Sequence, residues 1–161
     1  MKSAIVMKSA RQRIRTAGIW LGAVTLVAVL GTAAAAVDTP STVDGAQTVR
    51  AEEVKTLMAQ GAKVFDLRKK ASYAEKHIPG AVYMKFDEKS AQTVNYDATA
   101  DSIDLSQLPA DKSVKVIFHG HGVDGWKGYK AAIAATKAGH RQVYFFRGGF
   151  AEWVEKKLPT E

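Results

Sequence analysis

The chain contains no cysteine among its 161 residues. This absence excludes disulfide bonds, thiolate metal sites, persulfides and cysteine nucleophiles. It also excludes the thiol-based phosphatase and arsenate-reductase reactions. The length suits a single domain, and a hydrophobic fraction of 47% is ordinary for a globular protein and too high for a disordered one.

Acidic residues are absent from the first 36 positions, which hold five basic residues. The whole chain has 23 Lys+Arg, 16 Asp+Glu and a formal net charge of +7. Without the N-terminal segment, 18 basic residues face 16 acidic ones, and the net charge is only +2. The basic character therefore belongs to the N-terminal segment, and we expect no binding to nucleic acid.

The N-terminal segment has the pattern of a targeting or anchoring sequence. Its basic residues precede an uncharged run at 17–37, in which four alanines lead to Val37. This order is typical of a secretory signal cleaved after Ala36. At about 1.5 Å per residue, the same run could also span a hydrocarbon core of roughly 30 Å. We predict that residues 1–36 form an apolar helix that is a signal peptide or a membrane anchor.

Both interpretations place the remainder of the chain outside the cytoplasm, because the basic end stays inside. The predicted location is the periplasm, with the protein either soluble or anchored to the inner membrane. The polar stretch at 37–47 is interpreted as a linker.

Residues 48–161 alternate short apolar runs with helical stretches, which predicts βα units around a parallel sheet. Helices are expected at 51–60, at 72–76, from the end of a glycine-rich loop to Ala138, and around Trp153. Strands are expected at 64–67, 82–84, 114–118 and 143–146. The polar stretch at 87–101 is interpreted as a surface loop or an insertion.

Three separated motifs together resemble the rhodanese-like domain. They are Asp66-Leu67-Arg68 with His77-Ile78-Pro79-Gly80-Ala81 after it, the loop HGHGVDGWKGYKAA at 119–132, and Arg147-Gly148-Gly149-Phe150 with Trp153. The resemblance extends over residues 48–158. It implies an α/β fold with a parallel five-stranded sheet and helices on both faces.

The loop resembles most closely that of bacterial exported rhodanese-like proteins of the CXXCW type. In an ungapped comparison, the sulfur-carrying cysteine of that subgroup falls on Gly120 and its second cysteine falls on Gly125. Trp126 and the stretch 129–132 are retained. The resemblance therefore implies a preserved scaffold without sulfur-transfer chemistry, and we expect no enzymatic activity and no cofactor.

The loop could still bind a ligand, and three interpretations remain open. Backbone amides of a glycine-rich loop can converge on an oxyanion, with help from nearby basic side chains. Histidines and a carboxylate can hold zinc or copper. The loop can also be an empty relic. The candidate anion site comprises Arg68, Gly120, Gly122, Gly125, Lys127 and Gly128, and the candidate metal site comprises His119, His121 and Asp124.

The sequence thus favours a catalytically inactive, exported rhodanese-like protein that acts through protein contacts. Such a protein could be an accessory or assembly factor, or a small subunit of an inner-membrane complex held by residues 17–37. The alternative is a periplasmic module that binds an oxyanion or a metal through the loop at 119–128.

Overall fold

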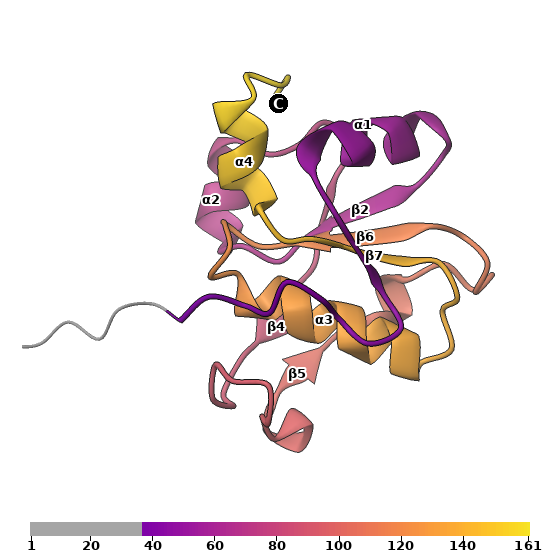
Figure 1. Cartoon of the computed structure of the whole chain (residues 1–161), viewed down its shortest axis with the longest axis vertical. Coiled ribbons are helices and arrows are strands. Elements are labelled where there is room, and N and C mark those ends of the chain that lie inside the picture. Colours follow the sequence, from indigo (N-terminus) through magenta and orange to yellow (C-terminus); the bar gives the residue numbers. More distant parts are fainter. Residues whose placement is uncertain (1–36) are drawn as a thin grey trace, which may run out of the picture. The chain divides into compact units, whose positions relative to one another are not determined.

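A computed structural model describes residues 37–161 of the chain (Figure 1). The apolar helix predicted within residues 1–36, as signal peptide or anchor, lies outside the described residues. Between residues 37 and 161, no helix is both long enough and apolar enough to cross a membrane.

A parallel sheet of five strands forms the centre of the fold, in the order β1-β7-β6-β2-β3. The strands are β1 (Gln47–Val49), β2 (Lys63–Asp66), β3 (Val82–Tyr83), β6 (Val116–His119) and β7 (Val143–Phe146). The central strands are nearly continuous apolar runs, as expected where both faces of a sheet are covered. The predicted parallel sheet is confirmed, although β6 begins and ends later than the stretch expected at 114–118.

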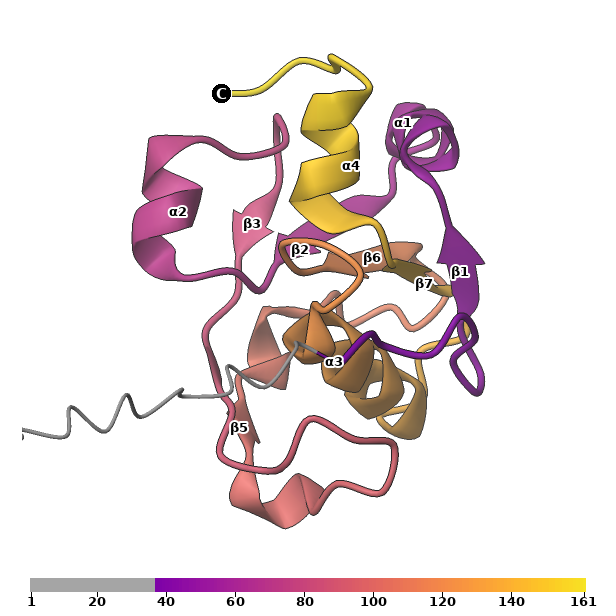
Figure 2. The same cartoon turned by 60° about the vertical axis from the view of Figure 1, so that its left-hand side comes forward.

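Helices cover both faces of this sheet, as predicted (Figures 1 and 2). They are α1 (Ala51–Ala59), α2 (Lys70–Glu75), α3 (Trp126–Lys137) and α4 (Gly149–Glu155). Successive strand residues point to opposite faces. Phe65 and Phe118 pack in the same core as α3, whereas Val64 and Ile117 pack in the core that includes residues of α1 and α4.

Residues 37–46, here called the strap, precede β1 and run alongside α3 (Figure 1). Thr39 is 2% exposed and Val43 is 5% exposed, and Val43 belongs to the core beneath α3. The structure therefore revises the interpretation of 37–47 as a linker. Burial was not predicted here because Val43 has only polar residues as its near neighbours in the sequence, and an isolated valine gives little periodic signal.

Residues 86–103, here called the insertion, form an ordered unit outside the main sheet. Its ends pair as two short antiparallel strands, β4 (Phe86–Asp87) and β5 (Ser102–Ile103). A 3-10 turn, η1 (Ala98–Ala100), precedes β5, and a second, η2 (Leu105–Gln107), follows it. The stretch at 87–101, predicted to be a surface loop or an insertion, thus has little regular structure, and the pairing of β4 with β5 joins its two ends.

A buried lysine organises the insertion from α3. The ammonium of Lys130 lies 2.8 Å from Glu88 Oε1 and 3.4 Å from Asp101 Oδ2, and it donates to Ser90 Oγ at 2.7 Å. The ring of Tyr96 lies 4.8 Å from the same ammonium. A buried charge is tolerated only when it is paired. The burial of Lys130 therefore explains why two carboxylates of the insertion lie against its ammonium.

Asp101 is the carboxylate that joins the two ends of the insertion. Burial by itself raises the pKa of Asp101, but hydrogen bonds from Ser90 and Lys89 and the charge of Lys130 outweigh it and lower the pKa to about 2. A lowered pKa in the folded state stabilises the fold above the ordinary carboxyl pKa. This contribution is lost as the pH falls from about 4 to about 2.

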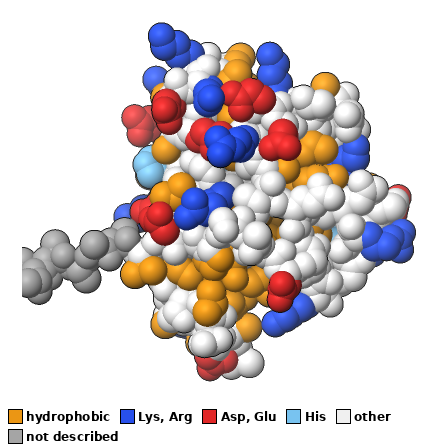
Figure 3. Space-filling model, viewed as in Figure 1, with side chains coloured by type: hydrophobic (Ala, Val, Ile, Leu, Met, Phe, Trp, Pro, Cys, Tyr) orange, Lys and Arg blue, Asp and Glu red, His pale blue; other side chains and the backbone are white. Residues whose placement is uncertain are grey.

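Charged and hydrophobic side chains separate on the face shown in Figure 3. Charged groups gather over α1 and α4, which are joined by an ion pair of 3.1 Å between Glu52 and Lys156. Hydrophobic side chains gather lower on this face, near α3 and β5. Among the described residues, Val37 of the strap and Val94 of the insertion are the most exposed large hydrophobic side chains.

Replacing the buried lysine should unfold the insertion and weaken the whole domain. We expect Lys130→Ala to lower the free energy of unfolding by about 3 kcal/mol, because it leaves two buried carboxylates without a cation. Lys137→Ala, at an exposed position of the same helix, should change it by less than about 0.5 kcal/mol. Urea denaturation of both variants measures the difference, and equal stabilities would contradict the role given to Lys130.

Candidate functional site

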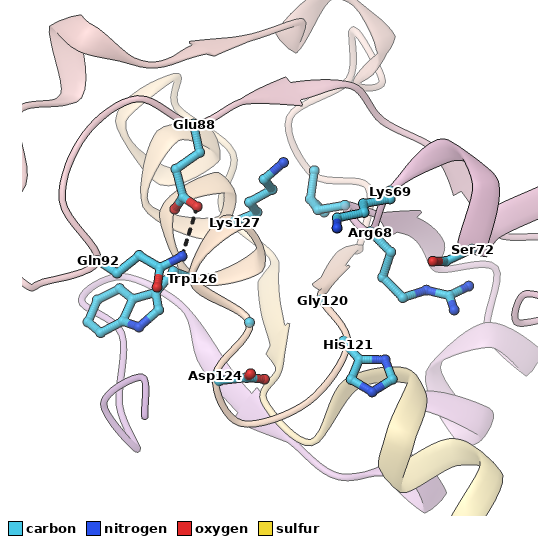
Figure 4. Close-up of a pocket in the computed structure, with 12 residues that line it drawn as sticks. Arg68, Lys69, Ser72, Glu88, Gln92, Gly120, His121, Asp124, Trp126 and Lys127 are labelled. Carbon is cyan, nitrogen blue, oxygen red and sulfur yellow. Dashed lines mark hydrogen bonds between the residues drawn. The ribbon is translucent and has the colours of Figure 1, made fainter. Parts of the chain in front are cut away.

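The candidate site lies where β2 and β6 end side by side. Asp66 is the last residue of β2 and pairs in register with His119, the last residue of β6. Ligand sites of open parallel sheets lie at this carboxyl edge. A pocket of about 380 Å³ opens there (Figure 4). It is lined by Leu67, Arg68, Lys69, Ser72, Glu88, Gln92, Gly120, His121, Asp124, Gly125, Trp126 and Lys127.

The glycines of the loop pack against one another beneath this pocket. A Cβ atom on Gly120 would lie 2.8 Å from the Cα atom of Gly125, closer than real Cβ contacts. A Cβ atom on Gly125 would lie 2.8 Å from Gly122 O, and one on Gly128 would lie 3.0 Å from Gly120 N. The loop is therefore closed on itself in a conformation that leaves no room for a side chain at position 120.

The beginning of α4 holds this closed loop from one side. The amides of Phe150 and Ala151 donate to the carbonyl oxygens of Gly120 and His121, at 3.2 and 2.7 Å. Gly149 adopts a φ of 57°, and a Cβ atom there would lie 2.6 Å from Gly120 O. Only glycine accommodates both that backbone angle and that approach. Gly149 thus serves the contact between loop and helix.

The strap holds the loop from the other side. The indole Nε1 of Trp126 donates to Val37 O at 2.6 Å. Both the amide and the hydroxyl of Thr39 donate to Val123 O, at 2.8 and 2.7 Å. Arg147 in turn donates to Thr39 O from Nε and Nη2. These contacts connect residues more than 80 positions apart, and the sequence offers no local signal for them.

Arg68, predicted to help hold an anion, is engaged inside the fold. Its Nη2 atom lies 2.7 Å from Asp66 Oδ2 and donates to Lys76 O at 2.6 Å. Its Nε atom donates to both oxygens of Asp66, and its guanidinium carbon lies 3.8 Å from the centre of the Phe150 ring. Figure 4 shows the guanidinium directed away from Gly120. The structure therefore places Arg68 beside the pocket but commits most of its donors elsewhere.

The other predicted anion-binding groups are also partly occupied. The amide of Gly125 donates to Gly122 O and the amide of Gly128 donates to Gly125 O, at 2.9 and 3.0 Å. Lys127 lies at the pocket, where its ammonium donates to Phe86 O at 3.0 Å. The loop is thus a set of internal turns, and Lys127 adds a positive charge at its rim.

The three residues of the predicted metal site do not converge. His119 is fully buried, and its Nδ1 donates to Gly120 O at 2.9 Å. Its Nε2 has no hydrogen-bond partner and lies 3.8 Å from Asp66 Oδ2. His121 and Asp124 are exposed. Within residues 37–161, no three His, Cys, Asp or Glu side chains are arranged to hold a metal ion.

Burial also determines the protonation of His119. It lowers the pKa of the imidazole, an effect that the nearby Asp66 carboxylate opposes. The ring is therefore neutral near pH 7. Because it is sealed from solvent, His119 has a structural role at the end of β6.

Six pocket residues were not predicted as site residues. Leu67 follows β2, and Trp126 begins α3. Lys69 and Ser72 come from the beginning of α2, and Glu88 and Gln92 come from the insertion. Gln92 donates to Glu88 Oε2 at 3.2 Å, which ties this wall together (Figure 4). The sequence contained one usable signal: Lys130 stands among small and aromatic residues of the expected helix, and the stretch at 87–101 upstream holds four acidic residues.

Introducing the smallest side chain at the closed point of the loop should be costly. We expect Gly120→Ala to lower the free energy of unfolding by about 1–3 kcal/mol, because its Cβ overlaps the backbone of Gly125. Gly122→Ala is the matched control, since its Cβ meets only ordinary contacts of 3.5 and 3.7 Å. Thermal or urea unfolding compares the two, and an unaffected Gly120→Ala variant would contradict the closed packing.

Comparison with known proteins places the chain in a family. The Rhodanese-like domain family matches residues 50–156. The thiosulfate sulfurtransferase GlpE of Pseudomonas fluorescens (strain Pf0-1) is 30% identical over 110 residues, which are 68% of this chain and 85% of that protein.

Two solved structures share the fold. The Alr3790 protein from Anabaena sp. has a TM-score of 0.52 at 24% identity, covering 70% of this chain and 81% of that one. A thiosulfate sulfurtransferase from Pseudomonas aeruginosa has a TM-score of 0.52 at 22% identity, covering 72% of this chain and 20% of that one. The sheet, the motifs and these matches together establish that the chain belongs to the rhodanese-like domain family.

Proposed function

We propose that this chain is a catalytically inactive rhodanese-like protein that is exported and acts through contacts with another protein. The observation that carries the proposal is the closed backbone packing of Gly120 against Gly125 beneath a pocket that stays open. The position that resembles the site of a sulfur-carrying cysteine has neither a side chain nor space for one. A preserved scaffold with an accessible pocket is suited to binding.

The absence of cysteine supports the inactive half of this proposal. Sulfur transfer through a covalent intermediate requires a nucleophile activated beside a general base or by a lowered pKa. Two histidines flank Gly120. His119 is sealed in the core and hydrogen-bonded to the backbone. His121 lines the pocket, but no hydrogen bond joins its ring to a nucleophile among residues 37–161. No such pair of nucleophile and base occupies the pocket formed by the described residues.

Contact with a protein is better supported than capture of a free oxyanion. Arg68 and two of the loop amides have their hydrogen bonds inside the fold. The remaining cations at the pocket are lysines, and an exposed ion pair contributes about 0–1 kcal/mol. Even millimolar binding requires about 4 kcal/mol, so lysines alone hold a small anion poorly. A partner protein adds contact area around the same pocket.

The role of accessory factor or small membrane-complex subunit depends on the N-terminal segment. The strap is packed onto the domain from residue 37 onward, with Val37 O bonded to Trp126. A leader retained up to residue 36 would hold the domain at the inner membrane. A leader cleaved after Ala36 would release a periplasmic protein with the same pocket.

The inactivity can be tested with the missing nucleophile restored. We expect neither the natural chain nor Gly120→Cys to transfer sulfur from thiosulfate to cyanide, because a cysteine side chain overlaps Gly125 and cannot reach the pocket. Thiocyanate formation and the intact mass, which reports any added sulfur atom, are the measurements. Pseudomonas fluorescens GlpE is the positive control. Turnover by the natural chain would refute the proposal.

The contact role can be tested by cross-linking in the native cells. A photo-reactive residue replaces Ser72 at the pocket or Lys55 at an exposed position of α1, in the full-length chain. We expect a discrete cross-linked protein from position 72 and none from position 55. The intact mass of the periplasmic and membrane fractions reports whether residues 1–36 are retained.

Two outcomes would contradict the contact role. One is the same diffuse labelling from both positions. The other is a lack of cross-links together with a melting temperature that rises with sulfate, thiosulfate, phosphate, zinc or copper, which would favour the ligand-binding alternative.

A further inference from the structure

Two lysines form a positive rim on the pocket above Gly120. Lys69 is the residue that precedes α2, and Lys127 lies in the first turn of α3. Figure 4 shows both side chains extending over the same pocket above Gly120. Residues separated by 58 positions thus bring two ammonium groups to one opening.

Neither lysine is neutralised by a carboxylate among residues 37–161. No carboxylate oxygen of this part of the chain lies within 4.0 Å of the ammonium of Lys69 or Lys127. The acceptor of Lys127 is the neutral carbonyl of Phe86, at 3.0 Å. A carbonyl is a neutral acceptor and uses one of the three donors of the ammonium, so the positive charge is not paired by this hydrogen bond.

The acidic side chains nearby are already matched to other cations. Glu88 lies 2.8 Å from the buried ammonium of Lys130, and its second oxygen accepts from Gln92. Asp66 accepts three hydrogen bonds from the Arg68 side chain. Among the carboxylates that line the pocket in the described part of the chain, Asp124 has no ion pair. A single carboxylate cannot balance the charge of two lysines.

The remaining lining suits a side chain rather than a whole secondary-structure element. A volume of about 380 Å³ is at the small end of ligand pockets. Ser72 offers a hydroxyl donor, and Trp126 and Leu67, which are 3% and 1% exposed, add a small apolar surface. An extended acidic side chain could lay its methylene groups on the apolar surface and direct its carboxylate to the lysines.

We propose that the partner protein inserts an aspartate or glutamate side chain into this pocket, where its carboxylate is held between Lys69 and Lys127. This inference rests on the proposed contact function and names the chemistry of the partner. Complementary charge mainly sets the rate and specificity of such an encounter, and salt weakens it. The buried Lys130 has a positioning role, because it keeps Glu88 from pairing with the rim.

Charge reversal tests this inference in the cross-linking system already described. With the photo-reactive residue at position 72, we expect Lys69→Glu with Lys127→Glu to reduce the cross-linked product by about tenfold or more. Lys69→Gln with Lys127→Gln should have a smaller effect in the same direction. Lys55→Glu with Lys137→Glu, an equal change of charge at two exposed positions outside the pocket, should leave the yield unchanged. The melting temperature of each variant confirms that it is folded.

Mass spectrometry of the cross-linked peptide supplies a second, independent readout. We expect the partner peptide to contain Asp or Glu next to the cross-linked residue, and its replacement by Lys to restore cross-linking to the doubly reversed variant. A peptide without an acidic residue, or a yield that charge reversal and added salt do not change, would overturn this inference while leaving the contact function standing. Absence of a cross-link from position 72 when Lys69 and Lys127 are both unchanged would instead refute the contact function itself.

Discussion

The close approach of two backbones, at Gly120 and Gly125, is the constraint on which the rest of the site depends. Because a Cβ atom at position 120 would lie only 2.8 Å from the Cα atom of Gly125, this contact forms only when neither position carries a side chain. Closure directs two amides of the loop inward and presents its carbonyls to the start of α4. Gly120 and Gly125 are thus packing elements of the loop.

A second constraint acts from the opposite wall of the pocket. Lys130 is almost completely buried, and its ammonium is paired with Glu88 and Asp101 of the insertion. The insertion is thereby fixed beside the loop, where Glu88 and Gln92 become lining residues. This ion network occupies Glu88, and Arg68 occupies Asp66, so neither of these two carboxylates neutralises Lys69 or Lys127.

Much of the fold could be predicted from the sequence, since its signals are local. The apolar runs of β6 and β7 and the helical stretches between them imply buried parallel strands, and the order of motifs implies the family. The strap and the insertion were not predictable in the same way. Thr39 and Val43 are buried by contacts with residues 84 or more positions away or in other elements, and such contacts leave no periodic pattern. The predicted role of Arg68 likewise depended on an orientation that only its contact with Asp66 determines.

The sequence by itself determined what chemistry is absent, because composition is independent of folding: a chain without cysteine has no thiolate in any conformation. It also determined the parallel α/β architecture, because hydrophobic periodicity is a local property. Only the tertiary structure decided that the glycines close the loop, that His119 is sealed inside while His121 is exposed, and that Lys69 and Lys127 share one opening. These features arise where distant segments meet at the carboxyl edge of the sheet, and their geometry is set by packing.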